Sequence, residues 1–145
     1  MSTQTNDSYL GNPNVKRDGV EHQFTQRELE EYIKCMNDPA YFARVYLKVI
    51  NLDKGLVAFD LYPYQEKMFN HFNDNRFSIV LACRQSGKSI SSVAYLLWYA
   101  IFKPEQTIAI LANKGATARE MLSRITLMLE NLPFFLQPGC KALNK

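Results

Sequence analysis

Residues 82–89 combine the residue types needed to hold a phosphate group, and they read Ala-Cys-Arg-Gln-Ser-Gly-Lys-Ser. Gly87 allows the backbone to approach a phosphate closely, the Lys88 amine can reach the β- and γ-phosphates of a nucleotide, and the Ser89 hydroxyl can bind Mg²⁺. These residues match the pattern G-x-x-x-x-G-K-[ST] except at its first glycine, where Ala82 stands. The segment therefore predicts a loop that binds the phosphates of ATP together with Mg²⁺.

Such a loop has to leave a buried strand and enter the N-terminus of a helix, where unpaired N–H groups and the helix dipole favour an anion. Residues 77–82 are a nearly unbroken apolar run of strand length, and apolar residues recur every three or four positions over residues 88–102. This context favours phosphate binding over a chance Gly-Lys-Ser in a surface turn.

The same alternation continues along the chain. Residues 107–112 form a second buried-strand run, and apolar residues at helical spacing mark a second helix over residues 118–129. The order strand, helix, strand, helix predicts parallel strands with right-handed crossovers. We therefore expect an α/β fold: a P-loop NTPase-like parallel sheet with flanking helices, incomplete in this chain and preceded by a small helical segment.

The front of the chain is expected to be simpler. Residues 1–23 are polar and turn-rich, which indicates a flexible N-terminal arm. Thr25 with Glu28 forms a capping-box pattern, and Asp38-Pro39 begins a second helix that runs to about residue 47. A hairpin of residues 49–52 and 56–59 and a helix over residues 63–72 should follow.

Three apolar side chains of the front helices have two possible roles. Leu29, Ile33 and Phe42 either pack into the core or form a docking surface for a partner. We expect packing.

The composition is that of an ordinary globular protein, with 47% hydrophobic and 21% charged residues. The net charge of +3 is too small to argue for nucleic-acid binding by itself. Cys35, Cys83 and Cys140 lie too far apart to suggest a zinc site or a disulfide framework. No apolar run approaches the roughly 20 residues that span a bilayer, so we expect a cytoplasmic protein without a membrane segment.

Residues 81–89 resemble the deviant Walker A loop of terminase large subunits, the DNA-packaging motors of tailed bacteriophages, whose loops read R-Q-x-G-K-[ST]. Residues 61–65, Leu-Tyr-Pro-Tyr-Gln, are similar to the adenine-recognising Q motif of that family. Residues 110–115 and 132–139 are also similar to segments of that family. In all, about residues 20–145 resemble the N-terminal ATPase region of the contractile-tail type.

The resemblance implies an ATPase with ATP and Mg²⁺ as cofactors. Arg84 would be an arginine finger acting in cis, and Arg84 and Lys88 would be the catalytic residues. Gln65 would hydrogen-bond the adenine, with Tyr64 available for stacking. The whole nucleotide site would comprise Gln65, Arg84, Gln85, Ser86, Gly87, Lys88 and Ser89, with Ser89 also holding the metal.

Two of these residues have plainer alternatives. Arg84 can equally be a solvated loop charge or half of a salt bridge, since surface arginines of this kind are common. Gln65 can lie on an unrelated helix surface, because the sequence gives no distance between it and the loop.

The family also implies partners. These are double-stranded DNA, the portal protein and the small terminase subunit, with a ring of subunits on the portal in the cytoplasm of an infected bacterium. Two other functions stay open: a helicase or restriction-type DNA translocase, and a non-catalytic nucleotide-binding fragment.

The sequence shows no Walker B aspartate, the acidic residue that completes the metal site of such motors. Magnesium coordination in such motors also uses a Walker B aspartate at the end of another strand, and no aspartate follows Asp74. Glu105, Glu120 and Glu130 lack a preceding apolar strand. We therefore expect residues 24–145 to be the N-terminal part of a P-loop ATPase domain, truncated before Walker B and without the nuclease domain. Alone, it should bind nucleotide weakly and hydrolyse it negligibly.

Overall fold

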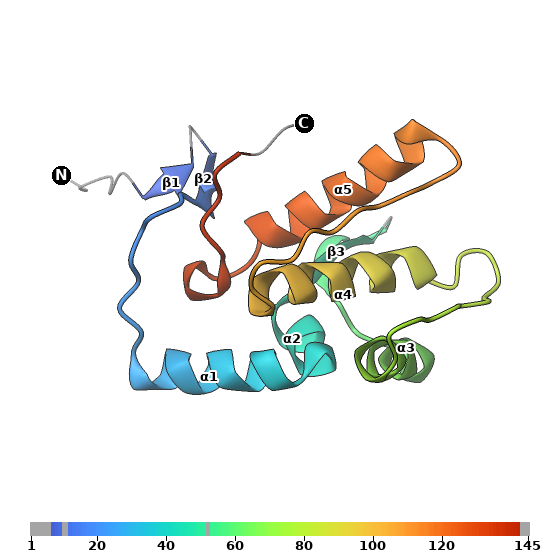
Figure 1. The fold of residues 1–145 in the computed structure, drawn as a ribbon, viewed down its shortest axis with the longest axis horizontal. Helices are drawn as coiled ribbons and strands as arrows, with labels where there is room; N and C mark the ends of the chain where they lie inside the picture. Colours follow the sequence, from blue (N-terminus) through green and yellow to red (C-terminus); the bar gives the residue numbers. More distant parts are fainter. Residues whose placement is uncertain (1–6, 10–11, 52, 143–145) are drawn as a thin grey trace.

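The computed structural model describes residues 7–9, 12–51 and 53–142. Within these ranges the fold is a mixture of α-helices and two small antiparallel sheets, with α4 in the middle of the molecule (Figure 1). The elements in chain order are β1 (Ser8–Tyr9), β2 (Asn12–Lys16), α1 (Gln26–Asn37), α2 (Pro39–Tyr46), β3 (Lys48–Asn51), β4 (Gly55–Ala58), α3 (Pro63–Asp74), α4 (Lys88–Phe102), α5 (Gly115–Glu130) and the 3-10 helix η1 (Phe134–Leu136).

The two front helices begin where the sequence predicts. The Thr25 Oγ1 accepts a hydrogen bond from the Glu28 amide at 3.3 Å, and the Glu28 carboxylate accepts one from the Thr25 amide at 2.8 Å. One carboxylate oxygen of Asp38 accepts from the amides of Ala40 and Tyr41 at 2.9 and 3.0 Å. These side chains satisfy N–H groups that the first turn of a helix cannot pair by itself, which stabilises both starts.

The core lies where α1, α2, α3 and α5 pack around α4. Its largest fully buried side chains are those of Trp98, Phe42, Phe69, Leu47, Met128 and Leu136. The indole N–H of Trp98 donates to the Cys35 carbonyl at 2.7 Å, so the buried polar atom of the tryptophan is satisfied while it joins α4 to α1. Burial in this core raises the pKa of the Cys35 thiol to about 12.

Helices α1 and α2 are also joined at the surface by Glu31. Its carboxylate accepts hydrogen bonds from Lys34 at 2.8 Å, from the Tyr41 hydroxyl at 2.8 Å and from the Tyr46 hydroxyl at 2.9 Å. These three donors lower the pKa of Glu31 to about 2. The Glu31 carboxylate therefore links α1 to α2 through two tyrosine hydroxyls.

The predicted hairpin is present. Strands β3 and β4 pair antiparallel, with Val49 opposite Val57 and Ile50 opposite Leu56. No helix among the described residues is both long and apolar enough to cross a membrane.

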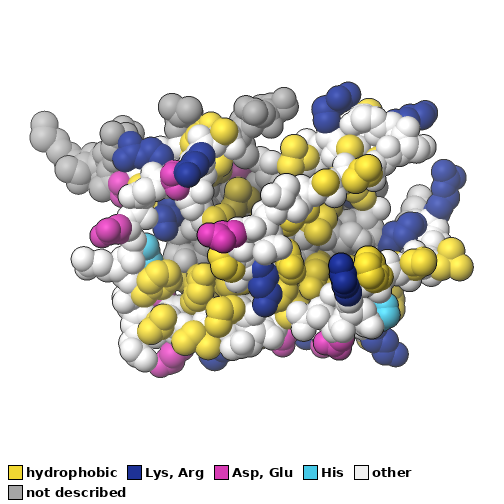
Figure 2. All heavy atoms as spheres, viewed as in Figure 1, with side chains coloured by type: hydrophobic (Ala, Val, Ile, Leu, Met, Phe, Trp, Pro, Cys, Tyr) yellow, Lys and Arg dark blue, Asp and Glu magenta, His cyan; other side chains and the backbone are white. Residues whose placement is uncertain are grey.

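The predicted parallel sheet is not present in the described part of the chain. Residues 77–82 and 107–112 run without regular secondary structure, and several of their apolar side chains face solvent: Ile79 is 95% exposed, Leu81 100% and Leu111 88%, whereas Val80, Ile108 and Ile110 are half-buried. Figure 2 shows hydrophobic side chains protruding along the first of these segments. A strand exists only when a neighbouring strand pairs with it, and neither segment has such a neighbour here. The coarser expectation of mixed helices and strands holds, whereas the described residues show no parallel sheet.

The packing expected of α1 is only partly right. Phe42 of α2 is fully buried, but Leu29 is 43% and Ile33 45% exposed. The inward face of α1 carries Tyr32 and Cys35 instead. The apolar stripe predicted from the spacing is real, but it straddles the edge of the buried face.

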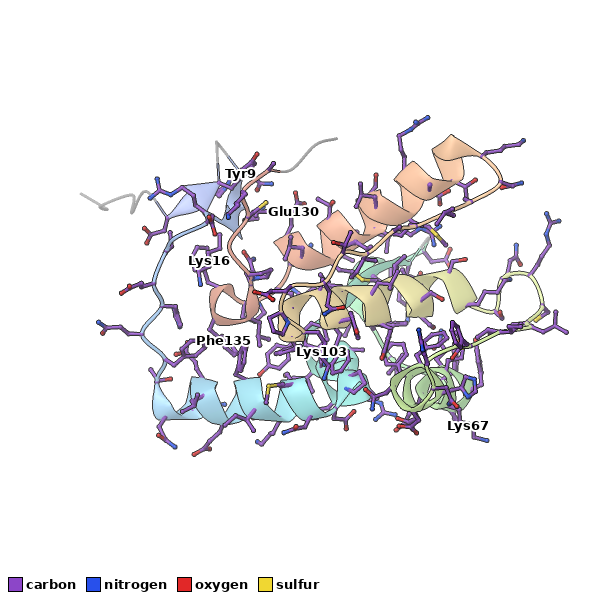
Figure 3. The ribbon with its side chains drawn as sticks, in the orientation of Figure 1. Tyr9, Lys16, Lys67, Lys103, Glu130 and Phe135 are labelled. Carbon is purple, nitrogen blue, oxygen red and sulfur yellow. The ribbon has the colours of Figure 1, made fainter. Side chains whose placement is uncertain are left out.

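Part of the segment expected to be a flexible arm is β2. Its residue Val15 is fully buried, and the side chain of Gln137 spans the contact between β2 and the C-terminal segment. Gln137 accepts from the Lys16 amide at 2.8 Å and donates to the Asn14 carbonyl at 2.8 Å. Figure 3 labels Lys16 and Glu130 beside this contact. Residues 1–6 of the expected arm lie outside the described residues.

Candidate phosphate-binding loop

The loop of residues 82–89 meets a helix start, as the motif requires. Gly87 is the N-cap of α4, and it has a left-handed backbone with φ 77°. Gln85, two residues earlier, also has a positive φ of 60°. No side chain caps α4, so the first N–H groups of this helix keep their capacity to bind an anion.

The Lys88 side chain lies back across the loop. Its amine donates to the Cys83 carbonyl at 3.0 Å, and the Ser86 hydroxyl donates to the same oxygen at 2.9 Å. A neutral carbonyl is a weaker partner for an ammonium than a phosphate oxygen is, because a charged acceptor roughly doubles the strength of such a bond. The amine can therefore exchange the carbonyl for an anion.

The serines that follow Lys88 differ in what they bind. The hydroxyls of Ser91 and Ser92 donate to the carbonyls of Gly87 and Lys88, both at 2.9 Å, and so are occupied by the helix itself. The Ser89 hydroxyl makes no hydrogen bond within the described ranges. Of the three, Ser89 is the one whose oxygen remains available to a metal ion.

Arg84 and Gln85 form the exposed tip of the loop. The Arg84 guanidinium pairs with no carboxylate among residues that the structure describes, so the salt-bridge alternative is not seen there. The geometry leaves Arg84 as a solvated cation beside the helix start.

Helix α3 packs directly against the loop, and this contact could not be inferred from the sequence. Gln65 is only 2% exposed, and its Oε1 accepts from the Tyr62 amide at 2.9 Å. Its Nε2 lies 2.6 Å from the position that a Cβ on Gly87 would occupy. The alternative that Gln65 lies on an unrelated helix surface is therefore wrong.

Tyr64, the neighbour of Gln65, makes a contact that sequence reasoning missed. Its hydroxyl donates to the carbonyl of Ser86 in the loop. Its ring stacks on that of Tyr62, with centroids 5.8 Å apart and planes 8° apart. The Q-motif resemblance suggested a stacking role for Tyr64, but no residue pattern signals a hydrogen bond to a backbone carbonyl 22 residues away.

The acidic residues that follow the loop have other contacts. Glu120 pairs with Arg124 on α5, and Glu130 accepts from the Asn12 side chain at 2.9 Å. Across the described residues, no group of three or more His, Cys, Asp or Glu side chains could hold a metal ion. The described residues therefore place no carboxylate cluster beside the loop.

No protein-family model matches the sequence.

Proposed function

We propose that this chain carries the ATP-binding part of a terminase large subunit, the ATP-driven motor that moves double-stranded DNA into a phage capsid. The observation that carries the proposal is the junction at Gly87: a Gly-Lys-Ser loop passes directly into an uncapped helix start, with the lysine amine lying across the loop. The start of α4 supplies unpaired backbone N–H groups and the loop supplies an ammonium, and a triphosphate needs both.

The proposal also includes a parallel sheet. Residues 77–82 and 107–112 would be parallel strands of a P-loop NTPase-like sheet. Their apolar side chains support this assignment, because Ile79, Leu81 and Leu111 are the most exposed of the large apolar residues that the structure describes. Buried parallel strands are rich in such residues on both faces.

Each loop residue has a role under this proposal. The Lys88 amine and the N–H groups at the start of α4 would bind the β- and γ-phosphates, and Ser89 would hold Mg²⁺ through its hydroxyl. Bound Mg²⁺ supplies neutralisation of the phosphate charge. Arg84 would place its guanidinium near the charge that develops on the transferred phosphoryl group, a role favoured because no carboxylate among the described residues pairs with it.

Gln65 would contribute in a different way from the one the family resemblance implies. Its Oε1 accepts from the Tyr62 amide at the start of α3, and its Nε2 lies against Gly87, so its carboxamide packs between α3 and the loop. Contact with an adenine would require one of them to change partner.

The partners follow from the family alone and are part of the proposal. They are double-stranded DNA, the portal protein and the small terminase subunit, in a ring assembled in the cytoplasm of the infected bacterium.

Titration of the 145-residue chain with a fluorescent, non-hydrolysable ATP analogue and Mg²⁺ tests nucleotide binding. We expect weak, saturable binding that Lys88→Ala abolishes, because the substitution removes the only ammonium at the loop. Lys67→Ala is the matched control, since Lys67 is exposed on α3 (Figure 3). We expect negligible ATP hydrolysis, because no aspartate follows Asp74 to complete the metal site.

Equal affinity in the wild type and Lys88→Ala would show that the loop does not grip phosphate. Turnover by the isolated chain that Lys88→Ala removes would instead show that an acid outside the expected Walker B position completes the site. Absence of binding to the folded wild type would favour an adaptor or binding fragment that keeps the fold without chemistry.

A further inference from the structure

Two consecutive residues of α3 contact two consecutive residues at the end of the loop. The Tyr64 hydroxyl donates to the Ser86 carbonyl, and the Gln65 carboxamide lies against Gly87. The first turn of α3 therefore contacts the peptide group that links Ser86 to Gly87, immediately before α4 begins.

That peptide group determines where one candidate phosphate donor points. In a trans peptide the C=O and the following N–H are coplanar and point in opposite directions. The carbonyl of Ser86 points toward Tyr64 on α3, so the N–H of Gly87 points away from α3. This N–H belongs to the helix start that would receive the anion.

The same peptide is free to rotate unless something holds it. Glycine tolerates positive and negative φ almost equally, so flipping the plane before Gly87 has little steric cost. The flipped plane would turn the carbonyl oxygen, which repels phosphate, toward the anion site. Gly87 has φ 77°, and the Tyr64 hydroxyl is the side-chain donor that holds the carbonyl in this orientation.

We propose that Tyr64 is a positioning residue for anion binding: its hydroxyl selects the orientation of the Ser86–Gly87 peptide in which the Gly87 N–H faces the phosphate. This inference rests on the proposed nucleotide-binding function and adds a residue to it. The ligand that benefits is any phosphate-bearing anion that binds at the start of α4.

Tyr62 provides a matched control for the test. The two rings stack on one another, so Tyr64→Phe and Tyr62→Phe each keep an aromatic pair. Only the first removes the hydroxyl that reaches Ser86, since the Tyr62 side chain is 63% exposed and its hydroxyl makes no hydrogen bond within the described residues. Circular dichroism and thermal unfolding of both variants check that the fold is kept.

The first measurement is the carbonyl ¹³C chemical shift of Ser86 without nucleotide. We expect Tyr64→Phe to shift or broaden this resonance and Tyr62→Phe to leave it at its wild-type position. A general loss of stability would not move one carbonyl selectively. An unchanged Ser86 resonance in Tyr64→Phe would overturn the proposal.

The second measurement is the affinity for the Mg²⁺-bound ATP analogue. We expect Tyr64→Phe to weaken it about 2- to 10-fold, which is the equilibrium effect of one neutral hydrogen bond, and Tyr62→Phe to match the wild type. A shifted carbonyl with unchanged affinity would overturn the positioning role while nucleotide binding stands. Wild-type protein that shows no affinity for the ATP analogue would overturn the proposed function. The Ser86 chemical shifts of the two variants would still establish whether the Tyr64 hydroxyl holds the Ser86 carbonyl.

Discussion

Gly87 is subject to two constraints that can be separated experimentally. Its φ of 77° favours glycine, and any Cβ there would lie 2.6 Å from the Nε2 of Gln65. The first constraint concerns the residue's own backbone, and the second concerns the contact between the loop and α3. Gly55 has nearly the same φ, 71°, but nothing lies within 4 Å of the position of its Cβ.

We expect Gly87→Ala to lower the free energy of unfolding more than Gly55→Ala does. Both substitutions incur the left-handed penalty, roughly 1–2 kcal/mol for a residue with a Cβ. Only Gly87→Ala also pushes Gln65 away from its hydrogen bond with the Tyr62 amide, which adds about 1 kcal/mol. Urea unfolding measures both variants, and equal losses would mean that Gln65 moves aside without cost.

For single residues, the sequence predicts which residues form the loop better than it predicts which residues contact them. The motif predicted that Gly87, Lys88 and Ser89 stand at a helix start, and they do. It could not predict the position of Gln65, because the distance between residues 65 and 87 depends on how α3 packs against α4. Backbone carbonyls such as that of Ser86 carry no signal in a sequence at all.

Among the elements, β2 depends most on a single side chain. The Nε2 of Gln137 lies within hydrogen-bond distance of the carbonyls of Asn14, Leu132 and Leu129, at 2.8, 2.9 and 3.2 Å, while its Oε1 receives the Lys16 amide. The side chain is only 5% exposed. Its amide thus substitutes for backbone pairing between β2 and the end of α5.

Replacing Gln137 with Met should weaken the attachment of β2. The substitution keeps the side-chain length but removes the part-buried hydrogen bonds to the Lys16 amide and the Asn14 carbonyl, each worth about 1 kcal/mol. Hydrogen exchange of residues 14–16 should quicken, and urea unfolding should show the loss. Gln23→Met, at an exposed position, is the control and should change neither measurement.

The front helices show that the sequence predicts where a helix begins better than it predicts which face is buried. Capping patterns at Thr25 and Asp38 located both starts, because a cap depends only on neighbouring residues. The buried face of α1 depends on the angle at which it meets α4, and the sequence does not encode that angle locally. For this reason Leu29 and Ile33 were expected inside and lie at the surface.

For the whole molecule, the main consequence of the architecture is exposed apolar chain. Residues 77–82 and 107–112 present Phe77, Ile79, Leu81 and Leu111 to solvent. An apolar, unpaired segment of this length is a template for association with another chain. The chain should therefore self-associate as its concentration rises.

Leu81→Lys should reduce this association without destabilising the fold. Leu81 is 100% exposed, so its replacement is expected to change the free energy of unfolding by no more than about 0.5 kcal/mol. Sedimentation velocity over a range of concentrations measures the association. Lys replacing Leu56, which is 45% exposed in β4, serves as a control for added charge alone. Equal self-association in the wild type and Leu81→Lys would mean that the segment is not the contact.

The helices and the hairpin could be predicted because their hydrogen bonds form between residues close in sequence. The parallel sheet could not be predicted securely from local signals, because a strand requires a hydrogen-bonding strand elsewhere in the chain. Residues 77–82 have the composition of a strand, and Leu81 nevertheless faces water, since composition cannot supply a neighbour.

The parallel bridge between Arg17 and Cys140 determines how tension would pass through the molecule. The Cys140 amide donates to the Lys16 carbonyl at 2.9 Å, and the Asp18 amide donates to the Cys140 carbonyl at 3.1 Å. Because the two segments run in the same direction, a force that draws residues 7 and 142 apart loads these bonds in shear, so they share the load instead of breaking one by one. The bridge should therefore resist such a pull together with the contacts that join β2 to Glu130 and Gln137.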